Sequence, residues 1–251
     1  MFPILNGARL HTLAFGGGPQ TIVTHGGWTG SWELWQEPFE LMSDRWRCIG
    51  YDHRGSGESV VAPEEISFEA LVADLWAVMD LHGVDTCVLA AESMGCSVAM
   101  AAAAERPERV DGLVLVSGRR TITPASAAAL AAGSRRDYPA TVAAFVDACL
   151  PEPDTEHLAR LGRRILLQSE PEAAARLLEA CYDQVPDLGR ITMPTAIIHG
   201  ASDRIVPVEE AYALHAAIPD SSLHVLDGIG HVPTLTAAAA VVSVIEQRFG
   251  T

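Results

Sequence analysis

Residues 87–105 read CVLAAESMGCSVAMAAAAE, and this stretch decides the fold. Residues 87–91 are an apolar run of strand length, and residues 95–105 are alanine-rich, which favours a helix. Only a very short turn, centred on Ser93, lies between them. A serine at such a strand–turn–helix junction is exposed at the edge of a sheet, beside the first turn of the helix. The stretch therefore predicts a nucleophile elbow that presents Ser93.

The residues around Ser93 are small, as a tight elbow requires. Side chains two positions before and two positions after the nucleophile must be tiny, because the strand and the helix otherwise collide. Gly95 satisfies this condition, and Ala91 stands where the G-x-S-x-G pattern has its first glycine. The N–H groups and the dipole of the following helix would stabilise negative charge that develops beside Ser93.

Outward from the elbow, strand-like runs alternate with segments of helical periodicity. Asn6-Gly7, between two apolar patches, predicts an antiparallel hairpin within residues 2–15. Strands that alternate with helices form βαβ units. We therefore expect an α/β fold with a mostly parallel central sheet and helices on both faces. Its strands are expected at 21–24, 47–51, 87–91, 113–117, 194–199 and 223–226, and its helices at 67–83, 95–105, 207–218 and 234–249.

The alternation stops between residues 119 and 187. This segment has no strand-like run, but it has helical periodicity near 138–149, 155–168 and 171–184 and an alanine-rich stretch at 125–132. A helical insertion within a resumed α/β pattern is typical of a cap over one end of the sheet. We expect residues 1–118 and 188–251 to form the core domain and residues 119–187 to form a helical cap, or lid, inserted in it.

Two residues downstream of Ser93 are candidates for the groups that activate it. A serine hydroxyl becomes a good nucleophile when a base takes its proton and an acid orients that base. Asp203 lies on the loop after the strand predicted at 194–199, and His231 lies on the loop after the strand at 223–226. The carboxyl ends of parallel strands meet at one edge of a sheet, where Ser93 also emerges. We therefore expect Ser93, Asp203 and His231 to form a catalytic triad.

An acyl-transfer site also needs two N–H donors directed at the oxyanion. The backbone N–H of Met94, directly after the nucleophile, is one candidate. The other is Gly27, on the loop after the strand at 21–24, because a glycine allows close approach of the backbone to a substrate. We expect the neighbouring Trp28 to form part of the pocket wall, and His25 to be a structural hydrogen-bonding residue.

Composition excludes several other functions. The formal net charge of −15 disfavours general binding to nucleic acid or to anionic lipid. All 17 basic residues are arginine, so the lysine of a P-loop or of a Schiff base is absent. The histidines show neither H-x-H nor H-E-x-x-H spacing, and no G-x-G-x-x-G follows a strand. We expect no metal and no cofactor.

The cysteines and apolar runs indicate the compartment. The five cysteines are scattered without C-x-x-C spacing, so they predict neither a zinc site nor a disulfide framework. No signal-peptide pattern begins the chain, and the longest apolar runs are far below the ~18 residues of a membrane span. We expect a cytoplasmic monomer or homodimer whose partner is a small-molecule substrate.

Taken together, these motifs resemble the α/β-hydrolase superfamily over essentially the whole chain. The resemblance implies that the run at 51–59 is a structural turn, so that Asp52 and Arg54 are scaffold. The insertion resembles the four-helix, V-shaped cap of small esterases, carbon–carbon bond hydrolases and hydrolase-type hormone receptors. Ala91 and the uncommon Glu92 depart from the family pattern; we expect Glu92 to be a surface or structural carboxylate, with contact to the acid–base groups as the alternative. The matching residues are 25–27 (HGG), 51–59 (YDHRGSGES), 91–95 (AESMG), Asp203 and His231.

The expected activity is that of a cofactor-free serine hydrolase acting through an acyl-enzyme. Apolar stripes on the cap helices predict a small, uncharged, fairly apolar carboxylic ester or lactone as substrate. Carbon–carbon bond hydrolysis or perhydrolase chemistry by the same triad stays open, as does a ligand sensor with slow turnover. We expect anionic substrates to be poor, because of the net charge of −15. The candidates for an anion clamp are the cap arginines Arg119, Arg120, Arg135 and Arg136.

Overall fold

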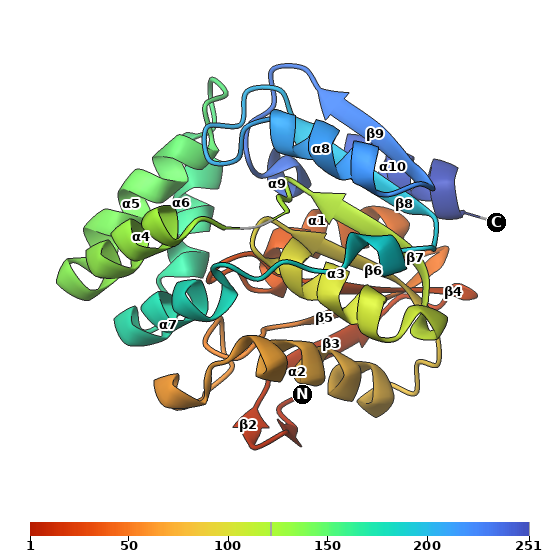
Figure 1. Cartoon of the computed structure of the whole chain (residues 1–251), viewed down its shortest axis with the longest axis horizontal. Coiled ribbons are helices and arrows are strands. Elements are labelled where there is room, and N and C mark those ends of the chain that lie inside the picture. Colours follow the sequence, from red (N-terminus) through yellow and green to blue (C-terminus); the bar gives the residue numbers. More distant parts are fainter. Residues whose placement is uncertain (121, 251) are drawn as a thin grey trace.

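A seven-stranded sheet forms the centre of the molecule (Figure 1). The computed structural model describes residues 1–120 and 122–250. The strand order is β3-β5-β4-β6-β7-β8-β9; β3 is antiparallel to β5, and every other neighbouring pair is parallel. The predicted mostly parallel sheet is thus confirmed. Its strands are β3 (Thr12–Phe15), β4 (Gln20–His25), β5 (Trp46–Tyr51), β6 (Cys87–Glu92), β7 (Val110–Val116), β8 (Thr195–Gly200) and β9 (Ser221–Leu226).

The middle of the sheet is buried on both faces. Every residue of β6 and of β8 is buried. Parallel strands that are covered on both sides consist of nearly continuous apolar residues, because neither face meets water. The same property made these strands visible in the sequence as short apolar runs.

The chain begins with a small hairpin that is separate from this sheet. Strands β1 (Ile4–Leu5) and β2 (Ala8–Arg9) pair antiparallel around Asn6 and Gly7, whose φ angles are 46° and 80°. Positive φ at both central residues suits the tight hairpin turn that an Asn-Gly pair favours. The expected pairing within residues 2–15 therefore ends at Arg9, because β3 pairs with β5 in the central sheet instead.

Helices cover both faces of the sheet. In Figure 1, α2 (Phe68–Leu81) and α3 (Gly95–Glu105) lie in front of it, and α1 (Gln36–Met42) and α10 (Ala238–Phe249) lie behind it. Helix α8 (Glu209–Ala217) packs against β8 and β9. The 3₁₀ turns are η1 (Trp32–Trp35), η2 (Pro63–Glu65), η3 (Pro107–Arg109) and η4 (Leu188–Arg190).

One predicted helix is interrupted. The helix expected at 234–249 consists of α9 (Pro233–Thr236) and α10, with a break at Ala237, where φ is −145°. Alanine is the best helix former, so composition gave no sign of this break. The chain turns here because α9 follows directly on the loop that carries His231.

Four helices lie between β7 and β8 in the sequence and gather together at the left of Figure 1. They pack mainly on one another, α4 with α5 and α7, and α5 with α6. Thr123 and Asp137 accept backbone hydrogen bonds at the starts of the first two helices, as N-cap residues do. The cap predicted at 119–187 includes residue 121, and the core segment predicted at 188–251 includes residue 251. These two residues lie outside the described part of the chain. The helices are α4 (Pro124–Arg136), α5 (Tyr138–Cys149), α6 (Glu156–Leu166) and α7 (Pro171–Cys181).

Hydrogen bonds connect these four helices to the loop after β4. Trp28 donates its indole N–H to the carbonyl of Ala174 at 2.8 Å. The Tyr138 hydroxyl lies 2.6 Å from the carbonyl oxygen of Leu166 and 3.3 Å from the hydroxyl of Thr29. The loop that precedes the candidate site is therefore fixed against the helices above it. None of the helices within residues 1–120 and 122–250 is long and apolar enough to cross a membrane.

Candidate active site

Ser93 lies on a strained turn between β6 and α3. Its φ is +54°, a left-handed conformation that non-glycine residues seldom adopt and that is common at functional sites. The backbone N–H of Ser93 donates to the carbonyl of Val116 on β7 at 2.8 Å, which holds the turn at the sheet edge. A Cβ on Gly95 would lie 2.2 Å from the carbonyl oxygen of Gly26 and 2.7 Å from the His25 ring. Only glycine fits at position 95, as the elbow pattern predicted.

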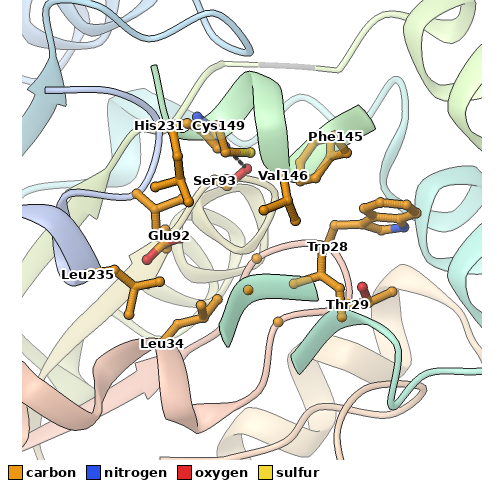
Figure 2. Close-up of a pocket in the computed structure, with 16 residues that line it drawn as sticks. Trp28, Thr29, Leu34, Glu92, Ser93, Phe145, Val146, Cys149, His231 and Leu235 are labelled. Carbon is orange, nitrogen blue, oxygen red and sulfur yellow. Dashed lines mark hydrogen bonds between the residues drawn. The ribbon is translucent and has the colours of Figure 1, made fainter. Parts of the chain in front are cut away.

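Three side chains predicted to meet form one hydrogen-bonded chain. The Nε2 atom of His231 is 2.8 Å from Oγ of Ser93, a contact that Figure 2 shows as a dashed line. The Nδ1 atom of the same ring is 2.7 Å from Oδ2 of Asp203. The side chains of His231 and Asp203 are 2% and 0% exposed. Since Nδ1 faces a carboxylate, its proton is held there, and Nε2 is left as the acceptor for the Ser93 hydroxyl.

The Asp203 carboxylate is held from several sides. Its Oδ1 accepts backbone hydrogen bonds from Ile205 at 2.8 Å and Val206 at 2.9 Å. Burial alone would raise the pKa of Asp203, but hydrogen bonds to His199 and His231 outweigh it and hold the pKa below its ordinary value. Asp203 therefore stays ionised at neutral pH, as an orienting carboxylate must.

His199, the penultimate residue of β8, was not among the residues predicted for the site. Its Nε2 lies 3.3 Å from Oδ2 of Asp203 and 2.9 Å from the carbonyl oxygen of Val206. The ring is fully buried. A histidine four residues before a candidate acid was the available signal, but a buried strand histidine has many structural explanations.

The loop that carries His231 is fixed by the end of α5 and the segment that follows it. The backbone N–H of His231 donates to the carbonyl of Cys149 at 2.8 Å, and that of Gly230 donates to Glu152 Oε1 at 2.7 Å. Both acceptors lie more than 70 residues earlier in the chain, which is why no local pattern pointed to Glu152. The four helices thus help to position the candidate base.

Gly27 and Met94, the two residues predicted to supply oxyanion donors, both lie beside Ser93. A Cβ on Gly27 would be 3.3 Å from Cβ of Ser93 and 3.9 Å from its Oγ, so the Gly27 backbone closely approaches the serine. Met94 directly precedes the first turn of α3. Within the described parts of the chain, neither N–H has a hydrogen-bond acceptor. His53 donates from Nε2 to the carbonyl of Gly27 at 2.9 Å, which fixes the orientation of that loop.

His25 lies beneath the site and not in it. Its Nδ1 is 2.5 Å from the hydroxyl of Tyr51, and its ring stacks on His53 with 5.0 Å between centroids. Burial, and secondarily the neighbouring His53, lower the pKa of His25 well below its ordinary value. A buried neutral ring in these contacts supports the loop.

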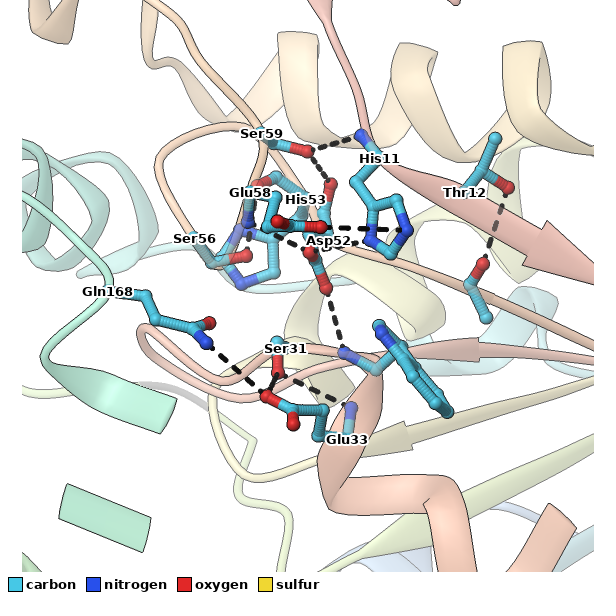
Figure 3. A network of polar contacts seen from close by, with 12 residues as sticks. His11, Thr12, Ser31, Glu33, Asp52, His53, Ser56, Glu58, Ser59 and Gln168 are labelled. Carbon is cyan, nitrogen blue, oxygen red and sulfur yellow. Dashed lines mark hydrogen bonds and ion pairs between the residues drawn. The ribbon is translucent and has the colours of Figure 1, made fainter. Parts of the chain in front are cut away.

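The turn at 51–59 forms a polar network beside the site (Figure 3). Asp52 accepts backbone hydrogen bonds from Trp32 and Glu58, each at 3.0 Å. Arg54 makes a buried two-point ion pair with Asp74, at 2.7 and 2.8 Å. These contacts join η1, the turn and α2, as expected for scaffold residues.

A small apolar cavity opens on one side of Ser93 (Figure 2). Its volume is about 40 Å³. Trp28, predicted for the pocket wall, lines it together with Phe145, and the two rings meet edge-on with centroids 5.1 Å apart. The cavity is also lined by Gly27, Thr29, Gly30, Leu34, Glu92, Val146, Cys149, Leu150, Gly162, Leu166, His231, Val232 and Leu235.

A larger and more polar cavity, of about 250 Å³, opens on the other side of the serine. Trp28, Ser93 and Phe145 belong to both cavities, so the Phe145 ring forms part of the wall between them. Two arginines, Arg119 and Arg204, line the larger cavity. The largely apolar pocket expected from the stripes of the cap helices therefore corresponds to the smaller cavity only. The other lining residues are Met94, Ile122, Ser126, Ala127, Leu130, Leu178 and Ile205.

Glu92 is a buried carboxyl group on the wall of the small cavity. Its Oε2 accepts a hydrogen bond from the Thr234 hydroxyl at 2.6 Å. Burial raises the pKa of Glu92 to about 7; the Thr234 hydrogen bond lowers it, and the nearby charge of Asp203 raises it. Of the alternatives considered for Glu92, the surface carboxylate is wrong, because only 2% of the residue is exposed.

Among the described residues, no group of three or more His, Cys, Asp or Glu side chains is placed to hold a metal ion.

The strand–Ser93–helix turn in a mostly parallel sheet defines the α/β-hydrolase class of fold. The model of the family described as alpha/beta hydrolase fold matches residues 20–186, and the chain belongs to this family. Among curated proteins, "Putative carbamate hydrolase RutD" of Pseudomonas syringae pv. syringae (strain B728a) is 26% identical over 229 residues, which cover 86% of this chain and 88% of that protein.

Solved structures agree with the fold over its full extent. The enol-lactonase from Burkholderia xenovorans LB400 has a TM-score of 0.92 at 22% identity, with 100% of each chain covered. A thermophilic esterase from Thermogutta terrifontis has a TM-score of 0.89 at 25% identity, covering 98% of this chain and 96% of that one. The fold is thereby established beyond the residues that the family model matches.

Proposed function

We propose that this protein is a serine hydrolase that cleaves a small carboxylic ester or lactone, with Ser93 as nucleophile. The observation that carries the proposal is the continuous hydrogen-bonded chain from Ser93 through His231 to Asp203, placed where two cavities meet. Such a chain lets the base take the serine proton while the carboxylate stabilises the resulting imidazolium.

In the first half of the reaction, Ser93 Oγ attacks the substrate carbonyl carbon and its proton passes to Nε2 of His231. The carbonyl electron pair moves to the oxygen, and the N–H groups of Gly27 and Met94 stabilise this oxyanion. The oxyanion then collapses and the bond to the alcohol oxygen breaks. His231 gives its proton to that oxygen, so the alcohol leaves neutral and an acyl-serine remains.

In the second half, water attacks the acyl carbon and gives a proton to His231. The second oxyanion accepts hydrogen bonds from the same two N–H groups, because the geometry at the carbon is the same. When it collapses, the bond from carbon to Ser93 Oγ breaks, and the serine regains its proton from His231. The sum is the addition of one water to one ester or lactone bond, with the enzyme unchanged.

The dimensions of the cavities limit the substrate. A volume of about 40 Å³ on the apolar side leaves room for a group of few atoms, on the order of two or three water-sized units. We propose that a short apolar group of the substrate binds there. The other part of the substrate then lies on the side of the larger cavity.

Carbamates are a second candidate substrate class. Curated relatives named carbamate hydrolase align with 86–91% of this chain, at 26–27% identity. A carbamate carbonyl is attacked in the same way as an ester carbonyl, but the adjacent nitrogen makes it less electrophilic. The same triad and oxyanion donors would serve both classes.

A panel of short-chain esters, lactones and carbamates, assayed with wild type and Ser93→Ala, tests the proposal. We expect turnover of at least one class by the wild type and its near-complete loss in the variant. Undiminished turnover by Ser93→Ala would contradict the proposal. A compound that binds tightly but is not hydrolysed would favour the ligand-sensor alternative.

A further inference from the structure

Two arginines share a cavity with the candidate nucleophile. Arg119 follows β7, and Arg204 lies next to Asp203 on the loop after β8. Both therefore come from the carboxyl edge of the sheet. They line the cavity of about 250 Å³ together with Ser93 and Met94. A ligand in this cavity that reaches the serine also passes the two guanidinium groups.

Arg119 forms no direct ion pair with a carboxylate in the described part of the chain. This half-buried side chain donates from Nη2 to the carbonyl of Ile205 at 2.7 Å, and within residues 1–120 and 122–250 no carboxylate forms an ion pair with it or with Arg204. A guanidinium has five N–H donors, so most of them remain for a ligand. Burial lowers the pKa of Arg119, while the charges of Glu210 and Asp203 raise it, which shows that the group is partly removed from water.

Arg136 lies outside the larger cavity, and the two other arginines predicted as an anion clamp, Arg120 and Arg135, are already paired. Arg135 makes an exposed ion-pair cluster with Glu172 and Glu179, at 2.7 and 2.5 Å. Arg120 is exposed and faces Glu210, 3.9 Å away. Neither side chain lines the cavity. Of the arginines predicted as an anion clamp, Arg119 is therefore the one beside the serine, and Arg204 was missed because it looked like an ordinary loop residue.

We propose that the larger cavity binds a carboxylate of the substrate through Arg119 and Arg204, while the small cavity takes an apolar group. This inference rests on the proposed hydrolase function and names its substrate class: short esters or lactones that bear a free carboxylate. A guanidinium suits this role because its planar fork matches a carboxylate and its hydrogen bonds to an anion are stronger than neutral ones.

The net charge of −15 does not oppose this assignment at short range. Charges on the protein surface are screened over ~8 Å at physiological ionic strength, so the acidic surface acts mainly on the approach of the ligand. Among the residues that line the larger cavity, the charged side chains are the half-buried Arg119 and the exposed Arg204. We therefore expect only the group of the substrate that binds in the small cavity to be uncharged.

Matched substrate pairs test the proposal. In the first pair, methyl hydrogen succinate is compared with methyl succinamate, which places the acid or its neutral amide on the acyl side. In the second pair, the acetyl ester of 4-hydroxybutanoate is compared with that of 4-hydroxybutanamide, which places the same groups on the alcohol side. We expect kcat/KM to favour the acid by about tenfold or more in one of the pairs, because hydrogen bonds to a charged group contribute more.

Single variants identify the source of that preference. Arg119→Gln and Arg204→Gln should each lower the acid-to-amide ratio of kcat/KM in the preferred pair by about tenfold. Arg120→Gln removes the same charge from outside the cavity and should leave the acid-to-amide ratio unchanged. No acid preference in either pair, or equal effects of Arg119→Gln, Arg204→Gln and Arg120→Gln, would overturn the anion site.

A binding measurement separates this proposal from the proposed function. Calorimetric titration of succinate into Ser93→Ala probes the cavity without turnover. Succinate binding that Arg119→Gln abolishes, in a protein that hydrolyses neither pair, would support the anion site and overturn the hydrolase proposal. Hydrolysis of the amides without acid preference would overturn the anion site alone. If the protein shows no turnover and no succinate binding, both proposals are overturned.

Discussion

His231 Nε2 lies 2.8 Å from Ser93 Oγ, although 138 residues separate them in the sequence. The serine is held by the elbow after β6. The histidine is held by a backbone hydrogen bond to Cys149, the last residue of α5, and its neighbour Gly230 by one to Glu152. The contact therefore depends on the sheet, on the loop after β9 and on the helices over the sheet edge at the same time.

If Ser93 and His231 act as one unit, the losses of activity caused by replacing each of them should not be additive. Ser93→Ala and His231→Ala should each lower kcat on the best ester by roughly 10³-fold or more, and the double variant should lose little further. The residual rate depends on the oxyanion donors, which all three variants retain. Steady-state kinetics with circular dichroism as a folding control measures this. Losses that multiply in the double variant would mean that the residues act separately.

Asp203→Asn should lower kcat by about 10⁴-fold, measured by steady-state kinetics on the best ester. The amide fills the same volume, but it allows the wrong tautomer of His231 and does not stabilise the imidazolium. Asp220→Asn is the matched control, because Asp220 is exposed and pairs only with Arg248 on the surface. Near-wild-type turnover by Asp203→Asn would show that the orienting acid lies elsewhere.

Glu92 should make the stability depend on pH. Its pKa is about 7 in the folded protein against an ordinary value of 4.5, so between these values the folded state holds a proton that the unfolded chain has released. The wild type therefore loses stability as the pH rises through this window. Glu92→Gln keeps an acceptor for Thr234 but does not titrate, so its stability should not fall in the same way. From pH 5 to pH 8 the variant should gain about 2 kcal/mol of unfolding free energy relative to wild type. Urea unfolding at several pH values measures this difference, and a constant difference would refute the buried titration.

Gly95→Ala should disrupt the elbow. The added Cβ would meet the Gly26 carbonyl oxygen at 2.2 Å, and backbone atoms cannot move aside as a flexible side chain can. We expect a loss of about 2 kcal/mol or more in unfolding free energy, together with loss of activity. Gly17→Ala is the control, since a Cβ there meets nothing within 4 Å, and it should change stability by less than about 0.5 kcal/mol. Equal stability of the two variants would contradict the packing described here.

Phe145→Ala should join the two cavities. The ring contacts Trp28 and His231 edge-on, at 5.1 and 6.3 Å between centroids, and lines both cavities. Its removal should raise the relative kcat/KM for longer acyl chains, while Val61→Ala, away from the site, leaves the chain-length profile unchanged. Each added methylene contributes about 0.8 kcal/mol of apolar burial where space exists. An unchanged profile in Phe145→Ala would place the acyl group elsewhere.

Much of the fold was predictable because its signals are local. The apolar runs of β6 and β8 and the small residues at Ala91 and Gly95 reflect requirements of burial and close packing that a few neighbouring residues satisfy. The meeting of Ser93, Asp203 and His231 was predictable from chain order, because parallel strands place the loops after them at one edge.

The remaining features depend on contacts between distant segments. The break at Ala237 and the support that Glu152 gives to the His231 loop have no local pattern. The spacing of His199 and Asp203 does not by itself distinguish a site residue from a buried strand histidine. Arg204 and Ser93 line one cavity together with residues of α4, a relationship between distant segments. The uncharged substrate was predicted from the apolar stripes of the cap helices and from the net charge, and neither shows which side chains line the cavity.

The central claim is that Ser93 is the nucleophile of a working hydrolase site, and covalent labelling tests it most directly. A fluorophosphonate probe is incubated with wild type, Ser93→Ala and His231→Ala, and the adduct is located by peptide mass spectrometry. We predict one adduct per chain of the wild type, on Ser93, none in Ser93→Ala and a greatly slowed reaction in His231→Ala. An adduct on another residue, or equal rates in wild type and His231→Ala, would contradict the account.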